Sequence, residues 1–311
     1  MHKISWIRLE FILAVVILAC SFAIMAVVQV ADAENQARFV SPDQALLALK
    51  EAAQRGDTNA LQKLFGPTLN EIANPDTIQR ANQLQGFAQH LSEFTELATQ
   101  VNQTVVIRLG SKHWPFPIPL VMTNGQWSFD TLAGKEEILN RRIGHNELSA
   151  IEVCHAYVQA QKEYALKDRA GDGVMAYAQH LRSKPGTKNG LYWESEPGGE
   201  LSPFGPLVAR AQEEGYYKLK GCTPFHGYIF KILKKQGRDA PGGKYIYVIN
   251  GHMVAGFGLL AYPVEWGNSG VMTFMVNLQG KVYQKNFGEK TMEQASRIDE
   301  YNPDATWREA E

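Results

Sequence analysis

Residues 222–233 read C-T-P-F-H-G-Y-I-F-K-I-L, and residues 242–288 read G-G-K-Y-I-Y-V-I-N-G-H-M-V-A-G-F-G-L-L-A-Y-P-V-E-W-G-N-S-G-V-M-T-F-M-V-N-L-Q-G-K-V-Y-Q-K-N-F-G. Short runs rich in Val, Ile, Tyr and Phe alternate here with Gly, Asn or Pro. β-branched and aromatic residues between turn residues are typical of antiparallel strands. The stretch therefore predicts an antiparallel meander, and the helical patterns before it make the fold class α+β.

The composition is that of a globular protein with no preference for polyanions. The 311 residues are 45% hydrophobic and 20% charged, which suffices for a sizeable core and two domains. The 31 Lys and Arg are balanced by 32 Asp and Glu. A net charge near zero gives no field that attracts nucleic acid or an anionic membrane, so we expect neither as a partner.

Residues 1–33 have the pattern of an export signal. Lys3 and Arg8 precede an uncharged, mostly apolar run at residues 11–30, and A-D-A follows at residues 31–33. A basic start, an apolar segment and a small-x-small site are typical of a cleaved signal peptide. We therefore expect a mature chain in the periplasm or outside the cell.

Other interpretations of this segment stay open. The run at residues 11–30 is long enough to remain as an inner-membrane anchor. Cys20 follows Leu-Ala as in lipoproteins, but the apolar run continues beyond it, where a lipidated cysteine would end it. Glu10 stands fifth from Trp6 as in type IV prepilins, although Ser5 replaces the glycine at which such leaders are cut.

We expect residues 34–145 to form an α+β domain. Ser41 and Asp57 have the sequence context of helix caps, and the Asn124-Gly125 pair predicts a hairpin. The expected helices begin after these caps and at residue 77, and the expected strands are 101–109, 118–123 and 126–130.

Three residues of this domain are candidates for ligand binding. His113 and Trp114 belong to K-H-W-P-F-P-I-P at residues 112–119, whose prolines cannot donate to a central ladder. The segment fits a stiff sheet edge and, as the alternative, the wall of a ligand groove. If this domain encloses a pocket, Asp130 or His113 would be the base. Side chains that point into an apolar cavity would favour that role.

The second domain is expected to cover residues 146–311. A short helix at residues 135–143 is predicted to end at Gly144, and Asn146 to cap a longer helix whose apolar face begins with Leu148. Further helices are predicted at residues 174–181, 207–214 and 291–299, with an irregular segment at 183–204.

Cysteine and histidine offer one candidate catalytic pair. Cys222 and His226 are four residues apart, a spacing at which a tight turn brings an imidazole near a thiol. We favour a structural role for both. After removal of the signal, Cys154 and Cys222 are the only thiols, and a disulfide between them and two separate buried thiols are equal alternatives.

The segment K-D-R-A-G-D-G at residues 167–173 is the candidate for a metal site. Asp168 and Asp172 take the first and fifth positions of a calcium-loop pattern, but Ala170 and Gln179 stand where ligands are required. We therefore expect a turn and no metal. The sequence has no zinc, nucleophile-elbow or phosphate-loop motif, and we expect no cofactor.

Seven stretches together resemble a bacterial family of uncharacterised proteins, domain-of-unknown-function family 2950. They include W-P-F-P-I-P-L, F-H-G-Y and G-V-M-T-F, and cover residues 114–120, 136–144, 146–164, 190–193, 202–207, 225–228 and 270–274. The family implies no activity. Residues 34–145 also resemble the cone-shaped nuclear-transport-factor-two-like or SnoaL-like fold. The helix after residue 146 and its strands are similar to the head of type II secretion pseudopilins.

The leading hypothesis is an exported envelope protein that binds an envelope partner or a small ligand and lacks catalytic machinery. One rival is an exported hydrolase or isomerase with a pocket in the N-terminal domain. Another is a pseudopilin-like component, for which processing would fall near Trp6. The enzyme requires its candidate side chains to point into an enclosed cavity, whereas the pseudopilin-like component requires a chain that keeps Glu10.

Overall fold

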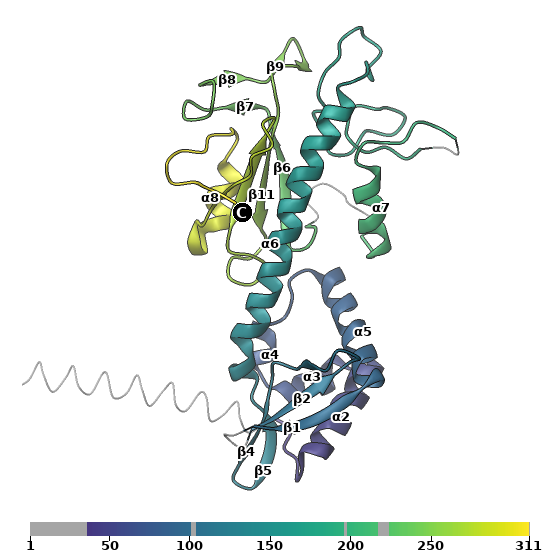
Figure 1. Cartoon of the computed structure of the whole chain (residues 1–311), viewed down its shortest axis with the longest axis vertical. Coiled ribbons are helices and arrows are strands. Elements are labelled where there is room, and N and C mark those ends of the chain that lie inside the picture. The colour runs from purple at the N-terminus through teal and green to yellow at the C-terminus, as the bar shows by residue number, and fades with distance from the viewer. Residues whose placement is uncertain (1–35, 101–103, 196–197, 217–223, 311) are drawn as a thin grey trace, which may run out of the picture. The chain divides into compact units, whose positions relative to one another are not determined.

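The chain folds into two compact α+β units with antiparallel sheets (Figure 1). A computed structural model describes residues 36–100, 104–195, 198–216 and 224–310. Unit 1 is Met1–Ala73 with Leu84–Glu136, and unit 2 is Asn74–Gln83 with Glu137–Glu311. The last passage of the chain from unit 1 to unit 2 comes after Glu136. The interpretations of residues 1–33, including Glu10 and Cys20, lie outside the described residues.

The helices of unit 1 begin at the expected caps. The Ser41 hydroxyl accepts a hydrogen bond from the N–H of Gln44, and the Asp57 carboxylate accepts one from the N–H of Ala60. Gly56 ends the first helix in the left-handed conformation that glycine favours. The helices are α2 (Pro42–Arg55), α3 (Thr58–Phe65), α4 (Thr68–Glu71) and α5 (Thr77–Glu93), of which residues 77–83 belong to unit 2.

The sheet of unit 1 is antiparallel, in the order β1-β2-β4-β5, and β3 pairs with β2. Its strands are β1 (Thr95–Thr99), β2 (Val105–Leu109), β3 (Trp114–Pro115), β4 (Leu120–Thr123) and β5 (Gln126–Phe129). Asn124 and Gly125 join β4 to β5 with positive φ angles of 54° and 76°, which confirms the predicted hairpin. Phe65 packs on Phe129 and Phe116, and these rings join α3 to the sheet.

One continuous helix, α6 (Thr131–Tyr164), replaces the two helices predicted on either side of Gly144. A glycine inside a helix costs only about 1 kcal/mol relative to alanine, so it does not by itself end one. Asn146, the predicted cap, lies inside α6 with a fully buried side chain. Leu148, predicted to be buried, is 63% exposed, and the buried face runs through Val153, Cys154 and Tyr157 instead.

The main sheet of unit 2 confirms the predicted antiparallel meander, in the order β14-β13-β12-β11-β6. Its strands are β6 (Tyr228–Leu233), β11 (Gly258–Pro263), β12 (Thr273–Asn277), β13 (Tyr283–Lys285) and β14 (Arg308–Glu309). Between β6 and β11 the chain forms two small hairpins from β7 (Lys235–Gln236), β8 (Tyr245–Ile246), β9 (Val248–Ile249) and β10 (His252–Met253).

Helices cover both faces of this sheet (Figure 1). Leu259 and Phe274 share a hydrophobic cluster with the buried face of α6. Leu260 and Met275, which point to the other face, pack with Ala295 of α8 (Thr291–Arg297), which follows the 3-10 turn η1 (Gly288–Lys290). All residues of β11 and β12 are consequently buried.

An irregular segment connects α6 to α7 (Gly205–Glu213). The helix predicted at residues 174–181 is wrong, because this stretch is held by contacts to other parts of the chain. Tyr177 pairs with Met253 in an isolated bridge, and the side-chain amide of Gln161 bonds both the N–H and the C=O of Ala178. These contacts replace the hydrogen bonds that a helix would make.

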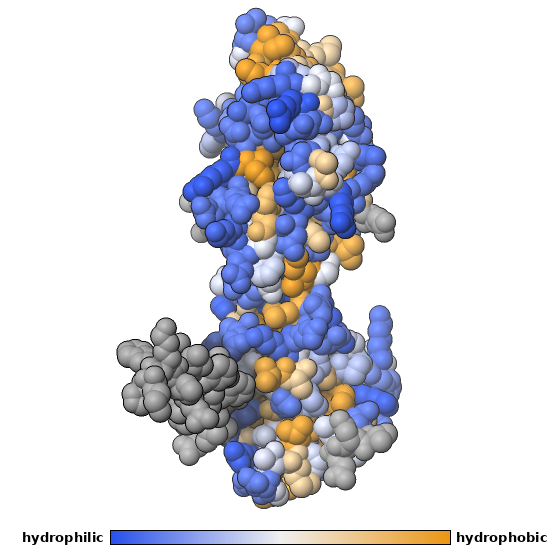
Figure 2. Space-filling model, turned by 90° about the vertical axis from the view of Figure 1, so that its left-hand side faces the viewer, coloured by the Kyte–Doolittle hydropathy of each residue, from blue (hydrophilic) through white to orange (hydrophobic). Residues whose placement is uncertain are grey.

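The surface is mostly polar on the face that Figure 2 shows, with apolar residues scattered among hydrophilic ones. Leu166 and Ile246 are examples of large apolar side chains that are more than half exposed. None of the helices within the described ranges is both apolar and long enough to cross a membrane.

We expect Leu260→Ala to lower the free energy of unfolding by about 2–5 kcal/mol, since it opens a cavity under α8. Leu260 is fully buried, whereas Leu166 is 73% exposed. The matched change Leu166→Ala should therefore shift stability by no more than about 0.5 kcal/mol. Urea denaturation of both variants measures the difference, and equal midpoints would contradict the assigned core.

Candidate functional site

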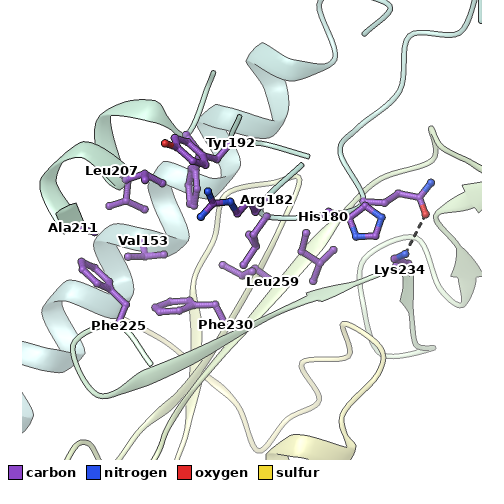
Figure 3. Close-up of a pocket in the computed structure, with 15 residues that line it drawn as sticks. Val153, His180, Arg182, Tyr192, Leu207, Ala211, Phe225, Phe230, Lys234 and Leu259 are labelled. Carbon is purple, nitrogen blue, oxygen red and sulfur yellow. Dashed lines mark hydrogen bonds between the residues drawn. The ribbon is translucent and has the colours of Figure 1, made fainter. Parts of the chain in front are cut away.

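A pocket of about 520 Å³ lies in unit 2 between the main sheet, α6 and α7 (Figure 3). Phe230 and Ile232 of β6 line it from one face of the sheet, because residues two apart in a strand point to the same side. Leu259 of β11 continues this apolar floor. The other apolar and aromatic lining residues are Val153 of α6, Leu181, Tyr192, Phe204, Phe225, and Leu207, Val208 and Ala211 of α7.

The pocket forms because the sheet is covered unevenly. Every residue of β11 is buried, whereas the four interior residues of β6 are only partly buried. β6 is the last strand of the sheet order, and α7 faces it across the pocket (Figure 3). The volume lies within the range of about 300–1,000 Å³ that is typical of small-molecule sites.

The mouth of the pocket is polar and basic. His180 and Lys234 line it at the end opposite to Phe225, Gln179 is hydrogen-bonded to Lys234, and Arg182 lies between this end and Tyr192 (Figure 3). The Lys234 ammonium donates to the Gln179 side chain over 3.1 Å. Partial burial lowers the pKa of His180 most, and the positive charges of Lys234 and Lys184 lower it further. The charges that act on His180 are thus both positive.

Next to the apolar end of the pocket, residues 225–228 form a tight turn. Phe225 and Tyr228 exchange backbone hydrogen bonds of 2.9 and 3.0 Å. His226 and Gly227 adopt positive φ angles of 47° and 70°. A Cβ at Gly227 would lie 2.8 Å from Cβ of Ser269, so glycine is required here for space as well as for conformation.

This turn holds the His226 ring between Ser149 of α6 and Glu214 at the end of α7. Nδ1 of His226 lies 2.6 Å from the Ser149 hydroxyl, and Nε2 is hydrogen-bonded to the Glu214 carboxylate. A carboxylate only accepts hydrogen bonds, so Nε2 donates to Glu214. Phe225, which lines the pocket, stacks on the His226 ring at a centroid distance of 4.2 Å.

Further buried hydrogen bonds surround this histidine. Asp76 accepts from the Tyr216 hydroxyl over 2.6 Å and from the N–H of Gly227 over 3.3 Å. Burial, and then the hydrogen bond to Asp76, raise the pKa of Tyr216, so this phenol stays protonated. Asn146 donates to the carbonyl of Ser269 and accepts from Gln79, each over 2.9 Å. Together these bonds tie the ends of α5 and α7 to α6 and to the turn.

The Ser149, His226 and Glu214 chain has the residue types of a nucleophile, a base and an orienting acid. Such chemistry requires a nucleophile that substrate can reach and a buried acid, and here the exposure of the two residues is reversed. Ser149 is 5% exposed and does not line the pocket, whereas the Glu214 side chain is 32% exposed. The hydrogen bonds of Ser149, His226 and Glu214 therefore hold α6 and α7 together, and we call these three residues the clamp.

Of the two cysteines expected in the mature chain, the structure describes Cys154. Cys154 is a free, fully buried thiol on α6, and burial raises its pKa to about 12. A buried thiol of this kind packs as a small core side chain. Cys222 lies outside the described residues, and the described partners of His226 are Ser149 and Glu214.

The candidate ligand residues of unit 1 do not converge. His113 is exposed, and its ring packs on Phe94 at 4.2 Å. Trp114 is 40% exposed in β3. The Asp130 carboxylate accepts from the N–H of Ala133 in the first turn of α6, as a capping residue does.

Asp168 and Asp172 form a turn. The Asp168 carboxylate accepts from the N–H groups of Gly173, Gly171 and Asp172, and these bonds lower its pKa, that from Gly173 most. Asp172 accepts from the N–H of Val174 and lies 3.6 Å from His252. Within the described part of the chain, no group of three or more His, Cys, Asp and Glu side chains could hold a metal ion.

Sequence reasoning missed the pocket and two of the three clamp residues. The partners of His226 are 77 and 12 residues away from it, and neither Ser149 nor Glu214 belongs to a recognisable motif. The apolar residues of β6 and α7 are visible in the sequence as core candidates. Their separation across a pocket depends on tertiary packing, for which the sequence contains no local signal.

We expect Ser149→Ala to lower the free energy of unfolding by about 1–3 kcal/mol, because it leaves a buried imidazole nitrogen without its partner. Ser92→Ala is the matched control, since Ser92 is exposed on α5 and donates only to a backbone carbonyl of its own helix. Chemical denaturation measures both variants. An unchanged unfolding midpoint for Ser149→Ala would show that the hydrogen bond does not clamp the helices.

Comparisons with known proteins identify the family. Neither the curated proteins nor the solved structures include a match to this chain. The sequence model of the family described as "Protein of unknown function (DUF2950)" matches residues 36–310, nearly the whole chain. The chain therefore belongs to the DUF2950 family.

Proposed function

We propose that this protein is a binding module that holds an apolar ligand in the pocket of unit 2. The observation that carries the proposal is the pocket of about 520 Å³, floored by Phe230, Ile232 and Leu259. A ligand that covers partly buried apolar side chains removes them from water. This stabilises the complex by about 25 cal/mol per Å² of apolar surface covered. An apolar ligand thereby completes the packing of β6.

The distribution of reactive groups supports binding over catalysis. His113 is exposed and Asp130 caps α6, so the rival that places a base in an N-terminal pocket gains no support from either residue. In unit 2 the Ser149 hydroxyl is buried away from the pocket lining. A bound molecule would meet mainly aliphatic and aromatic side chains, which have no chemistry for bond cleavage.

We also propose that the protein acts outside the cytoplasm, in the periplasm or at the cell envelope. The basic, apolar and small-x-small pattern of residues 1–33 supports export. An inner-membrane anchor formed by residues 11–30 is the alternative for the same segment. N-terminal sequencing of the exported protein distinguishes a chain that starts at Glu34 from one that keeps Glu10.

The finer fold relationships are part of this proposal. Helices followed by an antiparallel sheet in unit 1 support a kinship with the cone-shaped nuclear-transport-factor-two-like fold. In unit 2, α6 packed on an antiparallel sheet supports a kinship with pseudopilin heads. Neither relationship requires a filament or an enzyme, because one fold can carry many functions.

Filling the pocket should weaken ligand binding. We expect the native protein to bind the neutral apolar dye Nile red at one saturable site, and Ile232→Trp to weaken this binding by about tenfold or more because the indole occupies the cavity. Ile249→Trp is the matched control, since Ile249 is 50% exposed on β9 and does not line the pocket. Fluorescence titration measures both affinities.

Two results would overturn this proposal. One is the absence of saturable dye binding to the native protein. The other is equal binding by Ile232→Trp and Ile249→Trp, which would place the dye elsewhere. Thermal unfolding of each variant shows that the compared proteins are folded.

A further inference from the structure

The basic mouth of the pocket has a definite position relative to its apolar floor. Lys234 follows directly after β6, so it stands at the end of the strand that carries Phe230 and Ile232. Arg182 belongs to the irregular segment after α6. In Figure 3 Lys234 and His180 lie at one end of the pocket, and Phe225 and Ala211 lie at the other. The pocket is therefore amphipathic along its length.

Arg182 and Lys234 are available to a ligand because their interactions within the protein are weak. Arg182 pairs with Glu194 over 2.8 Å, but the two side chains are 45% and 78% exposed. Exposed pairs of this kind contribute about 0–1 kcal/mol. The ammonium of Lys234 donates to the neutral amide of Gln179, which leaves its positive charge unbalanced at that contact. An anion at the mouth would meet the charge of Lys234, which the contact to Gln179 does not neutralise.

The surroundings of His180 have the same sign of charge. Burial lowers the pKa of this ring most, and the positive charges of Lys234 and Lys184 lower it further. Arg182 also lies over the Tyr192 ring at 5.4 Å, which holds its guanidinium at the wall of the pocket. An arginine held in this way is well suited to a carboxylate or a phosphate.

We propose that the ligand is an anionic amphiphile: an aliphatic chain that carries one terminal carboxylate or phosphate. The chain lies on Phe230, Ile232 and Leu259, and the anionic group lies toward the polar end of the pocket, where Lys234 and Arg182 are the cations that line it. This inference rests on the proposed function, because it names the ligand class of the same pocket. The carboxylate and the phosphate share the chemistry that the mouth recognises, and the test separates them.

The test compares three molecules with the same tail: decanoate, decyl phosphate and 1-decanol. Each displaces Nile red from the native protein near neutral pH. We expect at least one of the anions to bind about tenfold tighter than the alcohol, a difference of about 1.4 kcal/mol. Whichever anion binds tighter identifies the head group. This preference should shrink as salt is added, since the mouth is exposed and its charges are screened.

The variant Arg182→Gln with Lys234→Gln should remove the preference for the anions, and its own affinity for Nile red is measured first so that displacement by the three molecules is compared within the variant. Lys162→Gln with Arg308→Gln is the charge-matched control, because both residues are exposed and neither lines the pocket. The single variant Lys234→Gln, expected to lose part of the preference, replaces the double variant if the latter fails to fold.

The outcomes distinguish this inference from the proposed function. Equal affinities for the anions and the alcohol, with saturable dye binding retained, would overturn the anionic ligand and leave apolar binding intact. An anion preference that survives in the double variant would also overturn it. The absence of any saturable dye binding would instead overturn the proposed function.

Discussion

Complete burial of β11 and β12 is the constraint on which unit 2 depends. Both faces of these strands are apolar, so each face needs a cover, and α6 and α8 supply the two covers. Such burial stabilises the fold by the transfer of apolar surface out of water. β6 stands at the end of the sheet, where its interior residues are only partly buried. The pocket results from this unequal coverage.

The polar contacts around His226 complement the apolar core. Burying a polar group costs free energy unless it is hydrogen-bonded, so a buried cluster is stable only when its members satisfy one another. Ser149, His226 and Glu214 satisfy one another through two hydrogen bonds. Asp76 and Tyr216 form another hydrogen bond nearby. These contacts fix α7 against α6. They also resemble a catalytic arrangement in residue types while differing from one in accessibility.

Local signals explain which parts of the fold are predictable from the sequence. The caps at Ser41 and Asp57 and the hairpin at Asn124-Gly125 depend on neighbouring residues, and the structure confirms them. Gly144 and Asn146 lead to a wrong helix boundary, because the packing of α6 outweighs local helix propensity there. The pocket and the partners of His226 depend on contacts between distant residues. Spacing along the chain contains no information about them.

The anchorage of α7 has a consequence for ligand exchange. This helix forms one wall of the pocket and is held by side chains, namely the buried Val208 and Ala211 and the contact of Glu214 to His226, whereas β6 and β11 are joined by a backbone ladder. Opening of a local element costs less free energy than unfolding of core strands. For the apolar ligand proposed above, uptake and release would need only a subglobal opening in which this wall separates from the intact sheet. The residence time of that ligand would then follow the rate of this local step and not the rate of global unfolding.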